Sequence, residues 1–262
     1  MSVVLKKHLA EVEAVVRKTA PQRSKQNPAS YIGGGVSSYR YAALSVPQVR
    51  SIYKHTPFSF RDKTPVAKIQ EIKTWDYIWQ KSQIYEVASL ALLHMSDGVK
   101  KGDLLAQHLP MLKKWALRLD NWAHSDSLSS VYTRILEADR KAMLPILEDW
   151  SDSKNPWLRR QSIVSLLYYS SARKEVLPFT KLISMLKKQL RHDDYYVQKG
   201  VGWTLREIGN VYPEQTFAFL ETHIGSVSAG AYSAATEKLS PARKNHIKKL
   251  RALGKGEAIG RR

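Results

Sequence analysis

The chain has 262 residues, which is enough for one large domain or two small ones, and its apolar content can form a core without covalent staples. The absence of cysteine excludes disulfides, thiolate metal sites and cysteine nucleophiles, and it favours a reducing compartment. Lys and Arg number 42 against 23 Asp and Glu, and the resulting net charge of +19 favours a polyanionic partner.

The basic residues run through the whole chain, whereas a membrane-binding protein would gather them on one helix with an apolar face. We therefore prefer nucleic acid to an anionic membrane surface as the partner. Residues Met1–Lys7 lack the apolar core of a signal peptide, and no apolar run approaches the roughly 18 residues of a membrane span. These features predict a cytoplasmic protein that does not enter a membrane.

Residues 3–19 have the pattern of an amphipathic helix, and a loop rich in Gly, Ser and Tyr follows at residues 21–45. Three consecutive glycines, Gly33–Gly35, break any helix there, and the stretch lacks the spacing of phosphate-binding and dinucleotide-binding loops. A flexible loop and a loop that contacts nucleic acid both fit this composition. Tyr31 is an aromatic side chain that such a contact would use.

From Val46 onward the pattern is helical throughout. Four stretches resemble one another, and their anchors Tyr85, Trp122, Leu158 and Val197 follow one another at intervals of 37, 36 and 39 residues. A period of this length is typical of HEAT-type helix pairs. We therefore predict an all-α fold, a HEAT-like helical-repeat solenoid (an α-α superhelix) with a concave basic groove. An unrelated all-α bundle with chance spacing is the alternative.

We expect a single repeat domain at residues 1–253 and a basic flexible tail at residues 254–262. Ser240 is a candidate N-cap for the last helix, and Gly254 is expected to end it. Eight prolines are expected at helix starts or inter-helix turns: Pro47, Pro65, Pro110, Pro145, Pro156, Pro178, Pro213 and Pro241.

Two of the predicted helices place a tryptophan away from their apolar stripe. In residues 196–208 the stripe contains Val197, Val201 and Leu205, and the opposite side carries Lys199, Trp203 and Arg206. In residues 119–136 the stripe contains Leu128, Val131 and Ile135, and the opposite side carries Trp122, Asp126, Ser129 and Thr133. Tryptophans that face outward beside a carboxylate and two cations indicate a functional surface.

Three blocks of residues resemble the AlkD-type DNA alkylation repair family, over roughly residues 46–221. They are Trp122 to Asp126, the run Trp157-Leu-Arg-Arg160, and the run Gln198-Lys-Gly-Val-Gly-Trp-Thr-Leu-Arg206. The third block is the most specific, and all three occur in the family's order. The resemblance implies a DNA glycosylase built from HEAT-like repeats, which excises cationic N3- and N7-alkylated purines from duplex DNA and needs no cofactor.

The resemblance also assigns roles to single residues. It maps the family's catalytic aspartate onto Asp126, its two site-lining tryptophans onto Trp122 and Trp203, and its active-cleft arginine onto Arg160. A family tyrosine from the N-terminal region corresponds to Tyr31. The usual pattern places two aromatic residues and a further Asp before the catalytic carboxylate. This chain has Asn121 and Ala123 on either side of Trp122 instead.

The implied chemistry needs few groups. An alkylated purine is already cationic and leaves without a general acid, and its departure produces an oxocarbenium-like sugar. A carboxylate beside that sugar stabilises the charge and orients water, while aromatic faces attract cations. We expect DNA contacts from six side chains: Tyr31, Arg159, Lys199, Arg206, Arg243 and Lys244.

Other classes of function remain as alternatives. Arg160 falls among Ile163, Val164 and Leu167 on a helical wheel, so it also fits a structural role, and its active-site assignment depends on the resemblance alone. A non-catalytic repeat protein that clamps DNA would use the same basic groove without Asp126, and a protein-interaction scaffold would use the repeats without DNA. The histidines lack metal-ligand spacing, so we expect no metal site. No lysine stands out as a Schiff-base amine, so we expect a monofunctional glycosylase. We also expect the protein to be a monomer.

Overall fold

The computed structural model describes residues 2–21, 37–56, 64–102 and 106–259. Within these ranges all regular structure is helical, apart from one isolated parallel bridge between Arg40 and Ile84. None of the helices in the described part of the chain is long and apolar enough to cross a membrane. The predicted all-α fold class is confirmed.

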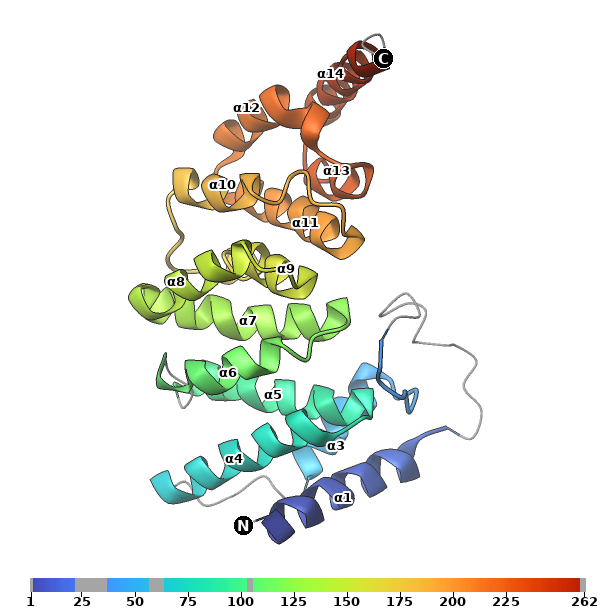
Figure 1. Cartoon of the computed structure of the whole chain (residues 1–262), viewed down its shortest axis with the longest axis vertical. Helices are drawn as coiled ribbons and strands as arrows, with labels where there is room; N and C mark the ends of the chain where they lie inside the picture. Colours follow the sequence, from blue (N-terminus) through green and yellow to red (C-terminus); the bar gives the residue numbers. More distant parts are fainter. Residues whose placement is uncertain (1, 22–36, 57–63, 103–105, 260–262) are drawn as a thin grey trace. The chain divides into compact units, whose positions relative to one another are not determined.

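The chain forms two compact units, which we describe separately: unit 1 is Met1–Val131 and unit 2 is Tyr132–Arg262 (Figure 1). Unit 1 contains α1 (Ser2–Thr19), α3 (Val46–His55), α4 (Pro65–Lys81), α5 (Tyr85–Lys101), α6 (Leu109–Ala116) and the first part of α7 (Trp122–Ala138). Unit 2 contains the rest of α7, α8 (Arg140–Ser151), α9 (Pro156–Val164), α10 (Phe179–Lys187), α11 (Tyr195–Val211), α12 (Pro213–His223), α13 (Ala229–Ala235) and α14 (Pro241–Ile259).

The four similar stretches of sequence lie on α5, α7, α9 and α11, and each of these follows a partner helix in the chain. In unit 1 α4 packs on α5, and in unit 2 α8 packs on α9 and α10 on α11. Figure 1 shows α9, α11 and α13 following one another within unit 2, where α11 packs on both of the others. The predicted helical repeat is confirmed, and the concave basic groove stays a prediction.

Side-chain caps define where three of these helices begin. The Asn121 Oδ1 accepts from the His124 amide at 2.9 Å, the Asn155 Oδ1 from the Trp157 amide at 2.9 Å, and the Asp194 Oδ1 from the Tyr196 amide at 2.8 Å. Each cap satisfies a backbone donor that the first helical turn would leave unpaired. An aromatic residue follows each cap within two positions, so the caps also place Trp122, Trp157 and Tyr196 at the starts of α7, α9 and α11.

The prolines and Ser240 behave mostly as expected. Pro65, Pro156, Pro213 and Pro241 each occupy the first position of a helix, and the Ser240 Oγ accepts from the Arg243 amide at 3.4 Å. The expectation for Pro145 is wrong, because this residue lies inside α8. Its ring is on the exposed side of α8, where solvent can bind the carbonyl that loses its partner.

The last helix also differs from the prediction. α14 continues through Gly254 to Ile259, so the expectation that Gly254 ends it is wrong. A single glycine costs a helix only about 1 kcal/mol relative to alanine, which the residues around it can offset.

The most specific sequence block, Gln198 to Arg206, lies on α11 and is explained largely by packing. The Gln198 Nε2 donates to the Gln189 and His192 carbonyls at 2.8 and 2.7 Å, which holds the preceding loop on the helix. A Cβ on Gly200 would lie 3.2 Å from the Arg160 Nη1, and a Cβ on Gly202 would lie 2.8 Å from the Ala231 Cα. The glycines therefore let α9 and α13 approach the backbone of α11 closely.

We predict that Gly202→Ala destabilises the protein by about 1–3 kcal/mol, because the new methyl group meets the backbone of α13, which cannot move aside as a side chain can. Urea unfolding followed by tryptophan fluorescence measures this change. Gly209→Ala on the same helix is the control. Its Cβ would meet the Thr216 Cγ2 at an ordinary 3.5 Å, so the higher helix propensity of alanine should leave stability unchanged or raised. Equal loss in both variants would contradict the close-approach explanation.

Candidate functional site

The candidate catalytic residues of unit 1 lie on the first turns of α7. Trp122 and Asp126 are four residues apart and both half-buried, while Leu128 and Val131 are fully buried. The predicted apolar stripe is confirmed, whereas the outward orientation of the Trp122–Asp126 pair stays a prediction, because both side chains are half-buried. Ser129 and Thr133, which were expected to share the outer face, are instead buried.

Ser129 and Thr133 are buried with their hydroxyl groups hydrogen-bonded, one within α7 and one to the end of α9. The Ser129 hydroxyl donates to the Ser125 carbonyl at 3.0 Å, and the Thr133 hydroxyl donates to the Ser165 carbonyl at 2.8 Å. A helix within a repeat stack has neighbours on more than one side, so a single apolar stripe underestimates its buried surface. Trp122 and Asp126 therefore occupy a narrower exposed strip than the wheel predicts.

The two departures from the family pattern lie beside this strip. Asn121 is fully buried and Ala123 is half-buried. The Asn121 amide caps α7 with its oxygen and donates with its nitrogen to the Asp120 Oδ1 at 2.9 Å and to the His124 Nδ1 at 3.1 Å. Asn121 is thus a structural residue that fixes the start of the helix carrying Asp126.

His124, to which the sequence assigned no role, is the centre of a buried polar cluster. Because its Nδ1 accepts from Asn121, its Nε2 carries the proton and donates to the Ser89 Oγ at 2.9 Å. Its ring stacks on Tyr85 with centroids 4.3 Å apart and planes 5° from parallel. Burial lowers the pKa of His124 to about 3, so the ring is neutral at physiological pH.

Two carboxylates hold the segment 37–44 against the starts of α5 and α7. The Asp120 Oδ2 accepts from the Ser38 amide at 2.6 Å and from its hydroxyl at 2.8 Å. The buried Glu86 accepts from the Ala42 and Leu44 amides at 2.9 and 3.2 Å. Residues 37–44 are therefore held near the first turn of α7. Tyr31 and Gly33–Gly35 lie outside the described residues.

Tyr39 connects this segment to the His124 cluster. Its ring meets that of His124 edge-on with centroids 5.1 Å apart, and the Arg118 guanidinium lies 5.4 Å from the Tyr39 ring. Burial raises the pKa of Tyr39 to about 12, although Arg118 opposes the shift. The base of α7 therefore consists of aromatic rings, the neutral polar groups of Asn121 and His124, and the side chains of Arg118 and Asp120 beside them.

In unit 2, Arg160 has a structural position. Its side chain is only 4% exposed, and its Nη1 donates to the Tyr196 carbonyl at 2.7 Å, at the start of α11. The alternative raised by the helical wheel, a buried arginine among apolar residues, describes this geometry, and its role in catalysis stays a prediction. Arg159, an expected DNA contact, donates through Nε and Nη1 to the Ser153 and Ser151 carbonyls at 2.6 and 2.9 Å at the end of α8.

Trp203 is half-buried and belongs to an aromatic cluster that the sequence did not reveal. Its ring stacks on Tyr168 at 5.1 Å and meets Tyr169 edge-on at 5.9 Å, and the Arg206 guanidinium lies 5.7 Å from its centroid. Tyr169 is 54% exposed and has a φ of +49°, a strained conformation for a bulky side chain. Such strain persists only where neighbouring contacts enforce it.

The contacts that enforce this conformation come from Glu207. Its buried Oε2 accepts from the Ser170 amide at 2.8 Å and from the Ser170 hydroxyl at 2.7 Å, which holds the loop after α9 on α11. No signal in the sequence marks the pair Tyr168-Tyr169, which follows an apolar run. Tyr168 and Tyr169 contact Trp203 only because the loop after α9 folds back onto α11.

A second row of aromatic residues marks the starts of α9 and α11. Trp157 stacks on Tyr196 with centroids 5.0 Å apart, Tyr196 meets Tyr195 edge-on at 5.2 Å, and the Lys199 Nζ lies 5.8 Å from the Tyr195 ring. Lys199, an expected DNA contact, is exposed here. In proteins that bind single-stranded or distorted nucleic acid, bases stack on aromatic faces that have a neighbouring cation.

The remaining expected DNA contacts lie on α11 and on the first turn of α14. Arg206 pairs with Glu237 at 2.7 Å and Arg243 with Glu214 at 2.6 Å, while Lys244 is exposed in the first turn of α14. The structure thus brings Trp122 together with Asp126 in unit 1, and Trp203 together with Arg206 in unit 2. Each pair is described within its own unit.

We predict that His124 makes stability fall on acidification. The unfolded chain takes up a proton at the ordinary histidine pKa of 6.5 and the folded protein only near 3, so lowering the pH from 7 to 5 should cost about 2 kcal/mol through this residue. Urea unfolding at both pH values should show that His124→Gln, besides being less stable, lacks this part of the pH dependence.

The exposed His55 supplies the control, because His55→Gln replaces a histidine by the same residue outside the buried cluster. If the stability of His124→Gln and the wild type fell equally between pH 7 and pH 5, His124 would not be held neutral in the folded protein.

Comparison with known proteins identifies the family. A family model described as DNA alkylation repair enzyme matches residues 7–239. A comparison with proteins of curated function found no match.

One solved structure with a TM-score above 0.5 shares the fold. A predicted DNA alkylation repair enzyme from Enterococcus faecalis is similar with a TM-score of 0.63 and 15% identity, over 84% of this chain and all of that one. The protein smu.31 of Streptococcus mutans UA159 has a TM-score of 0.49 and 18% identity, over 78% of this chain and 91% of that one. AlkD2 of Streptococcus mutans has a TM-score of 0.45 and 19% identity, over 79% and 96%. Since the family model covers most of the chain, the protein belongs to the DNA alkylation repair enzyme family.

Proposed function

We propose that the protein is a monofunctional DNA glycosylase that hydrolyses the N-glycosidic bond of cationic N3- and N7-alkylated purines in duplex DNA. The observation that carries the proposal is the pair of Trp122 and Asp126 on one strip of α7, in a chain of this family with a net charge of +19. A carboxylate with an aromatic face one turn away is the minimum set for stabilising a developing sugar cation.

Asp126 performs the central step in this mechanism. As the bond from C1′ to the purine nitrogen breaks, the bonding electrons pass to the cationic base, which leaves as a neutral molecule. The sugar then becomes oxocarbenium-like, and the Asp126 carboxylate stabilises that charge and orients the attacking water, from which it can accept a proton. No general acid is needed, because the leaving group carries its own positive charge.

The aromatic residues and Arg160 have supporting roles. Trp122 offers its face to the sugar or the cationic base beside Asp126, and in unit 2 Trp203, backed by Tyr168, offers a second such face. Arg160 acts as a positioning residue, because it is buried and donates to the Tyr196 carbonyl at the start of the helix that carries Trp203.

The fixed N-terminus of α7 supports this assignment. Asn121 caps the helix, His124 is neutral and buried, and neither residue places a charge beside Asp126. The departures from the family pattern at Asn121 and Ala123 therefore concern residues at the start of α7. They do not replace the Asp126 carboxylate.

We predict that Asp126→Asn lowers the rate of release of methylated purines from methylated duplex DNA by about 10²-fold or more, because a neutral amide cannot stabilise the sugar cation. Chromatography of the released bases measures this rate. Affinity for undamaged duplex should stay within a few-fold, since removal of one negative charge cannot weaken attraction to phosphates.

Asp149→Asn on α8 is the matched control, because Asp149 is exposed and has no assigned role. It should release bases at the wild-type rate. If the wild type releases no base but binds duplex, the protein is a non-catalytic DNA clamp. Weak binding that does not depend on salt would indicate a protein-interaction scaffold instead.

A further inference from the structure

The most exposed ring of the aromatic cluster around Trp203 belongs to Tyr169, a residue for which the mechanism above has no role. Tyr169 is 54% exposed, whereas Trp203 and Tyr168 are half-buried. Its contacts with Tyr168 and Trp203 are edge-to-face, with the ring planes at 79° and 85°. Neither of these rings lies flat on Tyr169, and much of its aromatic surface is open to a ligand.

The Trp203 ring, in contrast, already has two groups over it. Tyr168 stacks on it with centroids 5.1 Å apart, and the Arg206 guanidinium lies over it at 5.7 Å from the centroid. An aromatic face attracts a cation through its negative potential, and a cation that is already present repels the next one. The face of Trp203 that Arg206 covers is therefore a poor place for a cationic ligand, and Tyr169 offers the better one.

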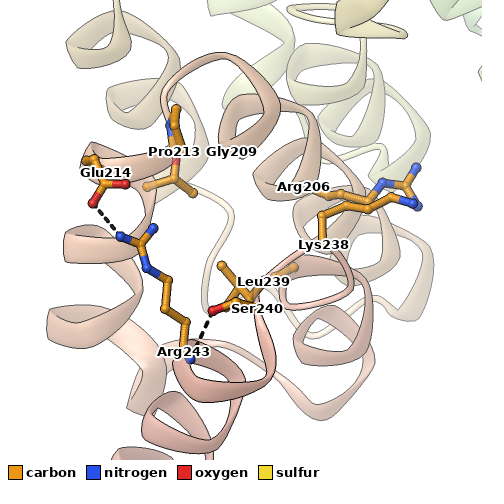
Figure 2. A pocket seen from close by; sticks show the side chains of 10 residues that line it. Arg206, Gly209, Pro213, Glu214, Lys238, Leu239, Ser240 and Arg243 are labelled. Atoms are coloured by element: carbon orange, nitrogen blue, oxygen red, sulfur yellow. Dashed lines mark hydrogen bonds and ion pairs between the residues drawn. The ribbon is translucent and has the colours of Figure 1, made fainter.

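Two carboxylates fix Arg206 and offset its charge. The Arg206 Nη1 lies 2.7 Å from the Glu237 Oε2, and its Nη2 lies 3.4 Å from the Glu207 Oε1. Figure 2 shows the charged end of Arg206, like that of Lys238, extending away from the pocket between α11, α12 and α14. The paired glutamates lower the repulsion that a cationic ligand at Tyr169 would meet from this arginine.

Glu207 also holds the backbone that presents Tyr169. Its Oε2 accepts from the amide and the hydroxyl of Ser170, the next residue in the chain, and the Asn210 Nδ2 donates to the Ser170 Oγ at 3.2 Å. Glu207 is only 5% exposed, so water competes little with these hydrogen bonds. They enforce the φ of +49° at Tyr169, a conformation that a bulky residue would otherwise leave.

We infer that Tyr169 is a substrate-contacting residue whose ring receives the positively charged alkylated base, and that Glu207 is a positioning residue that acts through it. The inference rests on the proposed function, because it takes Trp203 as part of the site that meets the lesion, and it adds a determinant of selectivity for cationic over neutral bases. A strained residue costs stability, and an exposed ring regains little of it by burial, which favours binding over a structural role.

The test compares two duplexes that differ in the charge of one base. One carries a single N7-methylguanine, which is cationic, and the other carries 7-deaza-7-methylguanine at the same place, which has the same shape and is neutral. Fluorescence anisotropy gives the ratio of the two affinities. All proteins carry Asp126→Asn, so that the base is not released during the measurement and the Asp126 carboxylate does not contribute to the ratio.

We expect the Asp126→Asn protein to prefer the cationic duplex, and the further change Tyr169→Leu to lower the ratio by about fivefold, the scale of one cation–π contact. Tyr169→Phe should keep the ratio, because it retains the ring. Tyr195→Leu is the matched control, since Tyr195 is an exposed tyrosine of the same unit, 59% exposed, with the Lys199 Nζ 5.8 Å from its ring. It should also keep the ratio.

A double-variant comparison tests the positioning role of Glu207. Glu207→Gln should lower the ratio in the same direction as Tyr169→Leu. The two changes together should lower it no further than Tyr169→Leu alone, because Glu207 acts through Tyr169. A larger loss in the combined variant would overturn the positioning role.

The remaining outcomes decide the role of Tyr169. The inference is overturned by an unchanged ratio in Tyr169→Leu, by an equal loss in Tyr195→Leu or Tyr169→Phe, or by equal affinity of the Asp126→Asn protein for both duplexes. Release of methylated purines by the wild type is measured separately. If bases are released while Tyr169→Leu keeps the ratio, only the inference fails. If no base is released while the ratio depends on Tyr169, only the glycosylase proposal fails.

Discussion

The position of α11 depends on two glycines, at which a neighbouring helix comes close to the α11 backbone. At Gly200 the Arg160 side chain from α9 lies against the helix, and at Gly202 the backbone of α13 does. Because packed interiors tolerate little change in volume, these contacts leave α11 little freedom to rotate about its axis. The outward face of the helix, with Lys199, Trp203 and Arg206, is oriented as a consequence.

The start of α7 in unit 1 is fixed by hydrogen bonds in place of close packing. Asn121 caps the helix and holds His124 in one tautomer, and Asp120 holds the segment after the glycine-containing loop. A buried neutral histidine between a carboxamide and a serine hydroxyl satisfies its hydrogen-bonding capacity and leaves no charge to compensate. Trp122 and Asp126 extend from this base on a helix whose first turn cannot unravel without breaking the cluster.

The strong positive charge of the chain is not simply a solvated surface. In unit 2 several cations are engaged by carboxylates or carbonyls: Arg159 caps α8, Arg206 and Arg243 pair with glutamates, and the Arg251 Nη1 donates to the Val227 carbonyl at 2.7 Å. Some of these bonds are buried and structural, and others are exposed and exchangeable. For a DNA-binding protein, this difference decides which arginines can reach a phosphate, and composition alone does not reveal it.

The sequence by itself determined the all-α class, the helical repeat and its period, the helix starts at Ser240 and at most of the prolines, and the buried apolar stripes of α7 and α11. These features follow from the period of apolar residues and from local capping, which depend on residues a few positions apart. The sequence missed the continuation of α14, the proline inside α8 and the burial of Ser129 and Thr133. It also missed the Tyr168–Tyr169–Trp203 cluster and the His124 cluster. Each of these features except the first two depends on groups brought together from separate helices or loops, and only the packing of those elements within each unit creates them.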